Sequence, residues 1–179
     1  MRAFPLLFLL LIGCKKDAPD LVVPDQLPPA TQTGANTFGC LLNGQAWLPS
    51  GGGLSGPFRV TYDPGYAGGS LQLRIDRAVA GLPDGQNMFI DGSSINKIGS
   101  YAASNAGPAG ISFTTGRQSG SCQEYYFFNY APGFSMKGQL TITRLDMRAG
   151  IISGTFDFTL AQTGCDTLKI TQGRFDKKL

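Results

Sequence analysis

The chain has 179 residues, with 15 Lys and Arg against 12 Asp and Glu and a formal net charge of +3. This balance, with no basic patch or stripe, argues against nucleic acid as a partner. The sequence contains no His, which excludes Ser-His and Cys-His nucleophilic pairs and every His-based metal site. With 25 Gly, 11 Pro and no helical period of useful length, the composition predicts many short strands joined by turns.

The front of the chain, residues 1–13, is predicted to be a signal peptide. Arg2 precedes an apolar run that is too short to span a bilayer. The sequence Leu-Ile-Gly-Cys that ends at Cys14 resembles the lipobox of bacterial lipoproteins, in which the Cys thiol is acylated before cleavage just ahead of it. We therefore expect lipidation of Cys14 and anchoring to a membrane through acyl chains. The alternative is a general secretory signal whose Cys falls near the cleavage site.

Residues 14–36 are predicted to be the lipidated Cys followed by a Pro-rich tether. Prolines at positions 19, 24, 28 and 29 and the near absence of aromatic residues leave too little apolar surface for this segment to order itself. Lys15, and not Asp, follows Cys14. By resemblance to the sorting rule of Gram-negative lipoproteins, the expected destination is the outer membrane, on a periplasmic or cell-surface face that the sequence leaves open.

The remainder, residues 37–179, is predicted to form a single all-β domain, which is long enough for a hydrophobic core. It opens with apolar residues in alternation from Phe38 to Leu42, followed by Asn43-Gly44 and a return run that contains Trp47. Asn-Gly between two such runs is a strong signal for a two-residue hairpin. The single Trp on the return strand is a candidate sugar-stacking platform, although a core or cap position is favoured.

Alternating patterns predict further strands through the middle of the chain, at 58–62, 71–76, 87–91, 95–101 and from residue 111. A long strand is expected from Cys122 to Tyr130, with five aromatic residues within six positions. Because its aromatic side chains point to both faces, this strand is expected either to be central and covered on both faces or to line a groove with one face. Burial on both faces is favoured. The candidate binding surface comprises Trp47, Tyr125, Tyr126 and Tyr130.

The last 40 residues predict three antiparallel strands. In the middle one, Phe156, Phe158 and Leu160 fall on one face, while Thr155 and Asp157 fall on the other. We expect a neighbouring aromatic ring over Gly154 and a bulge at Gly173 that restores the alternation. The predicted fold is a single antiparallel β-sandwich or flattened barrel that ends in a three-stranded meander.

Several stretches of the sequence together resemble a family of small Gram-negative lipoproteins of unknown function. This set of stretches spans essentially the whole mature chain. It consists of Thr37-Phe38-Gly39-Cys40, Asn43-Gly44, Trp47, Leu140 to Asp146, Ile152 to Phe156 and Ile170 to Asp176. The resemblance implies the fold and the outer-membrane address, and it supplies no catalytic residues.

Candidate chemistry is sparse. Glu124 is the only Glu, so a glycosidase pair would need Asp residues, and Asp146, Asp157 and Asp176 are available. Salt-bridged or turn-capping carboxylates are favoured over an acid and base couple. No cofactor or metal site is predicted. We expect a binding or assembly module for a protein, a glycan or a small apolar ligand, with a hydrolase that uses an Asp-based site as the alternative.

Three cysteines remain after Cys14, in an expected oxidising envelope. Three thiols allow three single pairings. Because the first and last strands of a sandwich or barrel often neighbour one another, Cys40 with Cys165 is the predicted bridge, leaving Cys122 free.

Overall fold

The computed structural model describes residues 26–116, 122, 124–125 and 133–179. Over these ranges the chain is all-β and contains no α-helix, only the short 3-10 helix η1 (Gly53–Ser55). The strands are β1 (Thr37–Leu42), β2 (Gln45–Trp47), β3 (Phe58–Asp63), β4 (Ser70–Val79), β5 (Leu82–Gly92), β6 (Gly99–Ser104), β7 (Ala109–Thr114), β8 (Glu124–Tyr125), β9 (Phe134–Asp146), β10 (Ile151–Gln162) and β11 (Leu168–Lys178).

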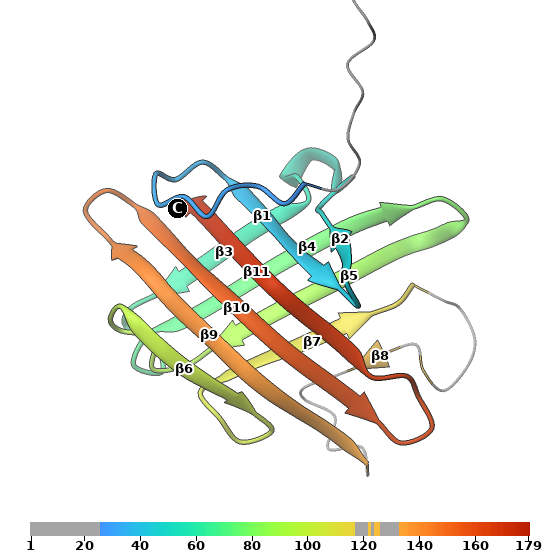
Figure 1. Cartoon of the computed structure of the whole chain (residues 1–179). Helices are drawn as coiled ribbons and strands as arrows, with labels where there is room; N and C mark the ends of the chain where they lie inside the picture. Colours follow the sequence, from blue (N-terminus) through green and yellow to red (C-terminus); the bar gives the residue numbers. More distant parts are fainter. Residues whose placement is uncertain (1–25, 117–121, 123, 126–132) are drawn as a thin grey trace, which may run out of the picture.

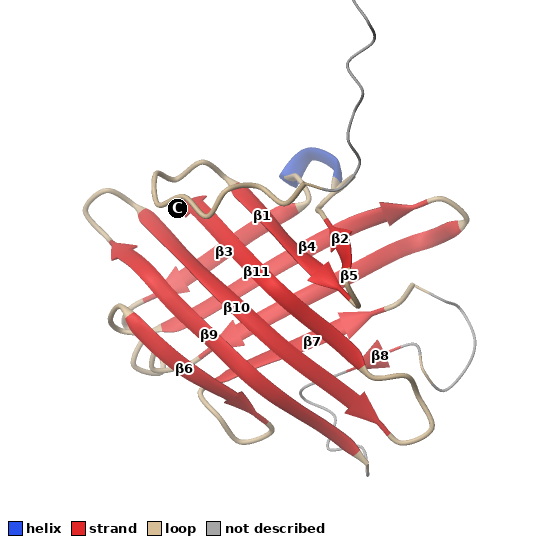
Figure 2. Ribbon diagram, in the orientation of Figure 1, coloured by secondary structure: helices blue, strands red, loops and turns tan. Residues whose placement is uncertain are grey.

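All described strands belong to one sheet (Figure 2), in the order β2-β1-β11-β10-β9-β6-β7-β5-β4-β3, with β8 paired to β7. The pairs are antiparallel except for a single parallel contact between Ala103 of β6 and Ala109 of β7. The predicted all-β class is therefore confirmed. β1 lies beside β11, so the first and last strands are neighbours as expected.

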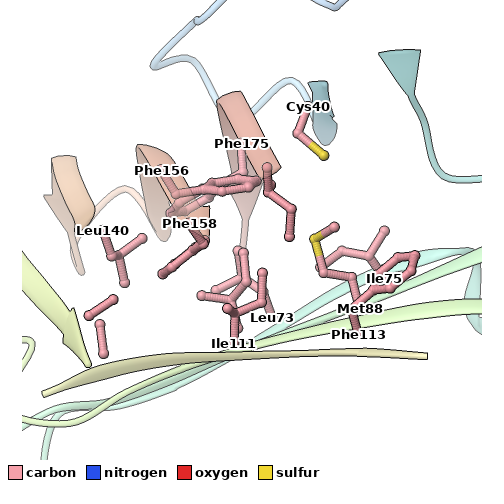
Figure 3. Packing of buried hydrophobic residues seen from close by; sticks show 14 of the residues in the cluster. Cys40, Leu73, Ile75, Met88, Ile111, Phe113, Leu140, Phe156, Phe158 and Phe175 are labelled. Carbon is pink, nitrogen blue, oxygen red and sulfur yellow. The ribbon is translucent and has the colours of Figure 1, made fainter. Parts of the chain in front are cut away.

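The sheet folds over on itself. In Figure 1, strands β1, β11, β10 and β9 lie in front of β3, β4, β5 and β7. Figure 3 shows Phe156, Phe158 and Phe175 on one side of the core, facing Leu73 and Ile111 on the other. The strand sequences explain this arrangement, because each places every second side chain on one face and those residues are the apolar ones. β4 illustrates it, since Leu71, Leu73 and Ile75 are fully buried while the residues between them are exposed.

Two details of the terminal strands were predicted, a bulge at Gly173 and an aromatic ring over Gly154, and both are present, with the bulge one residue earlier at Gln172. The register between β10 and β11 shifts so that Phe156 lies opposite Gly173 and Phe158 opposite Ile170, which places one extra residue in β11. Gln172 takes up the bulge with a φ of +51°. The ring of Phe175 lies over Gly154, where a Cβ would come within 2.7 Å of it.

The predicted hairpin of β1 and β2 is also present. Asn43 and Gly44 form its turn, with φ angles of +50° and +83°. The Asn43 side chain adds a function that the pattern did not predict. Its Oδ1 accepts a hydrogen bond of 2.8 Å from the Lys169 N–H and so ties the hairpin to β11.

Other predicted boundaries differ. The strand expected at 87–91 runs from Leu82 to Gly92, and the one expected at 95–101 begins only at Gly99. Ile95 is instead buried under the β3–β4 connection, with its N–H bonded to Gly69 O. The long aromatic strand expected at 122–130 falls mostly outside the described residues, which include only β8.

The predicted disulfide between Cys40 and Cys165 is wrong. Cys122 is bonded to Cys165, and Cys40 is buried and unpaired. β1 and β11 are neighbours as predicted, but their register keeps Cys40 and Cys165 apart. Pairing of β1 with β11 ends at Leu42 with Ile170, and Cys165 lies five residues beyond that point (170 − 165 = 5). Cys40, two residues further inside the pair, is out of its reach.

Candidate ligand-binding groove

Two of the four residues predicted to form the aromatic binding surface, Trp47 and Tyr125, are buried in the core. Trp47 is 1% exposed, and its indole N–H donates a 2.8 Å hydrogen bond to Gln86 Oε1. Tyr125 is also buried, and its hydroxyl donates to the Asp166 carbonyl at 2.7 Å. Both are core residues whose polar ends are satisfied, the alternative that was favoured for Trp47. Tyr126 and Tyr130 lie outside the described residues.

A different feature lies at the start of the described chain. Residues 26–36, which we call the N-terminal strap, were predicted to belong to the tether, yet they pack against the domain. Asp176 on β11 holds the strap through its carboxylate. Thr31 Oγ1 donates to it at 2.7 Å, and the backbone N–H groups of Thr33, Gly34 and Ala35 donate at 2.8, 2.8 and 3.1 Å. Ser153 Oγ on β10 adds a further bond of 2.7 Å.

The environment of Asp176 keeps it ionised. The residue is 1% exposed, and burial alone would raise the pKa of its carboxyl. The hydrogen bonds from Thr31, Ala35, Ser153 and Gly34 outweigh burial and hold that pKa well below its usual range. The carboxylate therefore acts as a clasp between the strap and the sheet.

A glycine makes room for the first turn of the strap. A Cβ on Gly39 would lie 2.7 Å from Pro28 Cδ and 2.9 Å from Leu48 Cδ2. Both side chains therefore rest directly on the backbone of β1. Gly39 does not have a positive φ, so its role here is close approach.

Beside the strap lies an open groove of about 550 Å³. Phe38 and Phe58, both largely buried and with ring centroids 5.3 Å apart, contribute to its lining. Its sides come from three stretches that are far apart in sequence: the strap, the chain after β2 and the chain after η1. The remaining lining residues are Gln26, Pro28, Asn36, Thr37, Leu48, Pro49, Ser55, Gly56, Pro57 and Lys177.

Lys177 supplies the one charged side chain in this lining. Its ammonium lies 5.1 Å from the centroid of the Phe58 ring and donates to the Phe58 carbonyl at 3.2 Å. Within the described part of the chain, no carboxylate lies close enough to form an ion pair with it. The groove is thus mostly apolar, with one cation whose remaining hydrogen-bond donors are available.

A second, smaller depression of about 320 Å³ lies where β4, β5 and β7 meet the β3–β4 connection. Tyr66, 69% exposed, stands at its rim, and Gln72 and Asp91 contribute polar groups. Burial raises the pKa of Asp91. Among the residues that the structure describes, no hydrogen bond or ion pair links these three side chains, so the depression lacks the organisation of the groove.

The structure does not assemble the three candidate Asp residues into a catalytic pair. Asp146 forms an ion pair with Arg144 at 2.8 Å, and hydrogen bonds from Arg144 and from the Ala149 N–H lower the pKa of Asp146. Asp157 is exposed on β10. Asp176 has its oxygens occupied by the strap and Ser153. The prediction of salt-bridged or turn-capping roles holds for Asp146, whereas the side chain of Glu124 lies outside the described residues.

Metal-binding and thiol chemistry have little support in the described ranges. No cluster of three or more His, Cys, Asp or Glu side chains is present among the residues that the structure describes. Burial raises the pKa of the Cys40 thiol to about 12, with nearby Arg77 acting weakly in the opposite direction. Cys40 is therefore a protonated core residue at neutral pH.

Sequence reasoning missed the strap and its clasp. The nearby Arg174 does not pair with Asp176, because the Arg174 guanidinium donates to the Gln172 and Pro28 carbonyls. A usable signal was present in the run from Thr31 to Ala35. Small polar and Gly residues in sequence present several adjacent N–H and O–H donors, which suits a buried carboxylate.

Comparison with models of known protein families, with curated proteins and with solved structures finds no match to this chain. The resemblance to a lipoprotein family thus stays a prediction. None of the described segments is a helix with the length and apolar character needed to cross a membrane.

Proposed function

We propose that this chain is an envelope lipoprotein, anchored to the outer membrane through Cys14, whose β domain is a binding module. The observation that carries the binding role is the apolar groove between the strap and the chain that follows β2 and η1. Such concave, mostly apolar sites with few polar groups are typical of ligand pockets.

The chemistry of the lining favours an amphipathic ligand. Phe38, Phe58 and Leu48 offer contacts to an apolar body, and the Lys177 ammonium offers a charge-assisted hydrogen bond to an anionic group at the rim. Of the three ligand classes expected from the sequence, the small apolar ligand is the one these residues suit.

Binding can be tested with dodecanoate, which combines an alkyl chain with a carboxylate. Lys177→Met keeps the apolar stem and removes the charge, and it should weaken dodecanoate binding about tenfold, the loss of one hydrogen bond to a charged group. Lys137→Met, an exposed Lys on β9, is the matched control and should bind as the native protein does. If the native protein shows no saturable binding of dodecanoate, the proposed role in binding amphipathic ligands is wrong.

The anchor has its own test. Cys14→Ser should move the protein from the detergent phase to the soluble or unprocessed fraction, because the acyl chains would have no attachment point. Identical partitioning with and without Cys14 contradicts lipidation and leaves the groove test unaffected.

We also infer that the folded-over sheet is a flattened barrel ending in a meander. The pairings of β9 with β10 and of β10 with β11 support the meander. Closure is supported by Ser50, just after β2, whose N–H donates to Asp76 O and whose carbonyl accepts from the Ala78 N–H, both at 3.1 Å. Hydrogen exchange tests it, since the amide of Ala78 should be protected.

A further inference from the structure

Four segments gather at one end of the domain, which we call the strap end. They are the strap, η1 with its flanking glycines, the β9–β10 turn and the last residues of β11, along the upper edge in Figure 1. The groove joins the strap to the chain after η1. Lys178 Nζ donates to the Ala149 carbonyl at 2.8 Å, and Asn36 Oδ1 accepts from the Lys178 N–H at 3.3 Å. These contacts make one continuous surface.

The strap end carries exposed apolar side chains. Leu54, at the centre of η1, is fully exposed, and no buried residue supports η1 from within. Met147, in the β9–β10 turn, is 50% exposed. A Leu at the tip of a short Gly-rich loop has no role in the core and is poised to contact something outside the domain.

The same end is basic. Lys177, Arg148 and Lys178 have no ion-pair partner among the described residues. The acidic side chains nearby are already engaged. Asp146 is paired with Arg144, and Asp176 is buried under the strap. Cations around protruding apolar residues are the pattern of a surface that rests on anionic phospholipid.

The position of the predicted anchor agrees with this orientation. Gln26, the first described residue, lines the groove at the strap end. Only 11 residues lie between it and Cys14, so the 12 steps along the chain (26 − 14) hold it within about 43 Å of the acylated residue even when fully extended. The end that carries Leu54 is thus the end at which the tether joins the domain.

From these observations, we infer that the strap end is a docking surface for the anionic phospholipid bilayer that carries the anchor. Leu54 and Met147 enter the interface while Arg148, Lys177 and Lys178 lie at the headgroups. This inference rests on the proposed anchor and adds an orientation to it. It places the mouth of the groove beside the membrane, where an amphipathic ligand would be dissolved.

Contact with lipid can be measured by tryptophan quenching. The protein beginning at Cys14 is coupled through that thiol to a maleimide lipid, in phosphatidylethanolamine and phosphatidylglycerol vesicles with brominated acyl chains. Cys14 is the thiol to react, because Cys40 is buried and Cys122 is bonded to Cys165. The chemical coupling makes the result independent of whether cells acylate Cys14. Native Trp47 is buried and provides an unquenched background.

The decisive comparison is Leu54→Trp in η1 against Tyr66→Trp in the β3–β4 connection, both at exposed positions outside the strands. The tryptophan at 54 should be quenched and the one at 66 should not. Replacing phosphatidylglycerol by phosphatidylcholine should reduce the fraction of protein in contact with the bilayer. Adding Arg148→Glu and Lys178→Glu should do the same. The expected reduction is about fivefold or more for each basic residue whose attraction to the lipid is lost. Equal quenching at 54 and 66 overturns the docking surface. Quenching that ignores the charge changes overturns the role of the basic residues.

Discussion

The ring of Phe156 on β10 lies directly over Gly173 on β11, at a distance of 2.3 Å from where a Cβ on Gly173 would stand. The reciprocal contact, Phe175 over Gly154, lies two residues along the same strand pair. Each ring covers the backbone that a glycine leaves open and fills the space of its missing side chain. The pair of contacts fixes the register at the bulge and explains why two glycines are placed inside long strands.

Gly173→Ala should therefore destabilise the protein by about 1 to 3 kcal/mol, because the new methyl group overlaps a ring in a packed core. The free energy of unfolding in urea measures it. Gly65→Ala is the matched control, since its Cβ would meet only Asp63 Oδ1 at 3.4 Å and its φ is not positive. In a Phe156→Ala background the cost of Gly173→Ala should largely vanish, and equal costs in the two backgrounds would contradict the contact.

Phe156 itself tests the predicted faces of β10. It is buried, whereas Thr155 is partly exposed on the other face. Phe156→Ala should cost about 3 to 5 kcal/mol, as large-to-small core substitutions do. Thr155→Ala should cost well under about 1 kcal/mol. Similar losses in denaturant melts would show that the strand is shifted by one residue.

The alternation along the strands was enough to predict the all-β class, the first hairpin and the faces of β10. These features depend on which residues are neighbours in sequence. The disulfide and the groove depend on long-range register. Cys40 lost its expected partner because β1 stops pairing at Ile170, and the groove exists because residue 28 meets residue 39 and residue 58 meets residue 177.

The buried Trp47 shows a further limit. An apolar ring on a hairpin strand fits both a platform and the core, and only the packing around it decides. Here the acceptor is Gln86, 39 residues away, which satisfies the indole N–H inside the protein. Periodicity cannot reveal a polar partner at that separation.

The clasp at Asp176 predicts a pH-dependent stability. Asp176→Asn replaces an acceptor oxygen by an amide N–H that faces donors, and it should cost about 3 kcal/mol at pH 7. The pKa of Asp176 in the folded protein lies below its ordinary value of 3.8, so the carboxylate contributes fully above that value. The contribution declines as the pH falls below about 4, since the unfolded chain then binds the proton more readily than the folded one.

The difference in unfolding free energy between the native protein and Asp176→Asn should therefore become smaller as the pH is lowered from about 5 to about 2. Asp157→Asn, at an exposed position on β10, is the control and should change stability by less than about 0.5 kcal/mol at either end. A gap that stays constant with pH would mean that the strap is held by contacts other than the ionised carboxylate.

The disulfide between Cys122 and Cys165 ties the β7–β8 connection to the β10–β11 turn. It spans 43 residues, for which the chain-entropy estimate is about 4 kcal/mol of stabilisation. The same turn is also held by hydrogen bonds from Tyr125 Oη to Asp166 O and from Thr163 N and Oγ1 to Gly133 O. Reduction should therefore lower the unfolding free energy by up to about 4 kcal/mol, while the hydrogen bonds of the turn remain.

Cys165→Ala should remove the sensitivity of stability to reductant, and Cys40→Ala should preserve it, because the buried thiol takes no part in the bridge. Non-reducing peptide mapping provides the direct check: a peptide that joins Cys40 to either of the other two cysteines would contradict this pairing, whereas alkylation of Cys40 only after unfolding agrees with it.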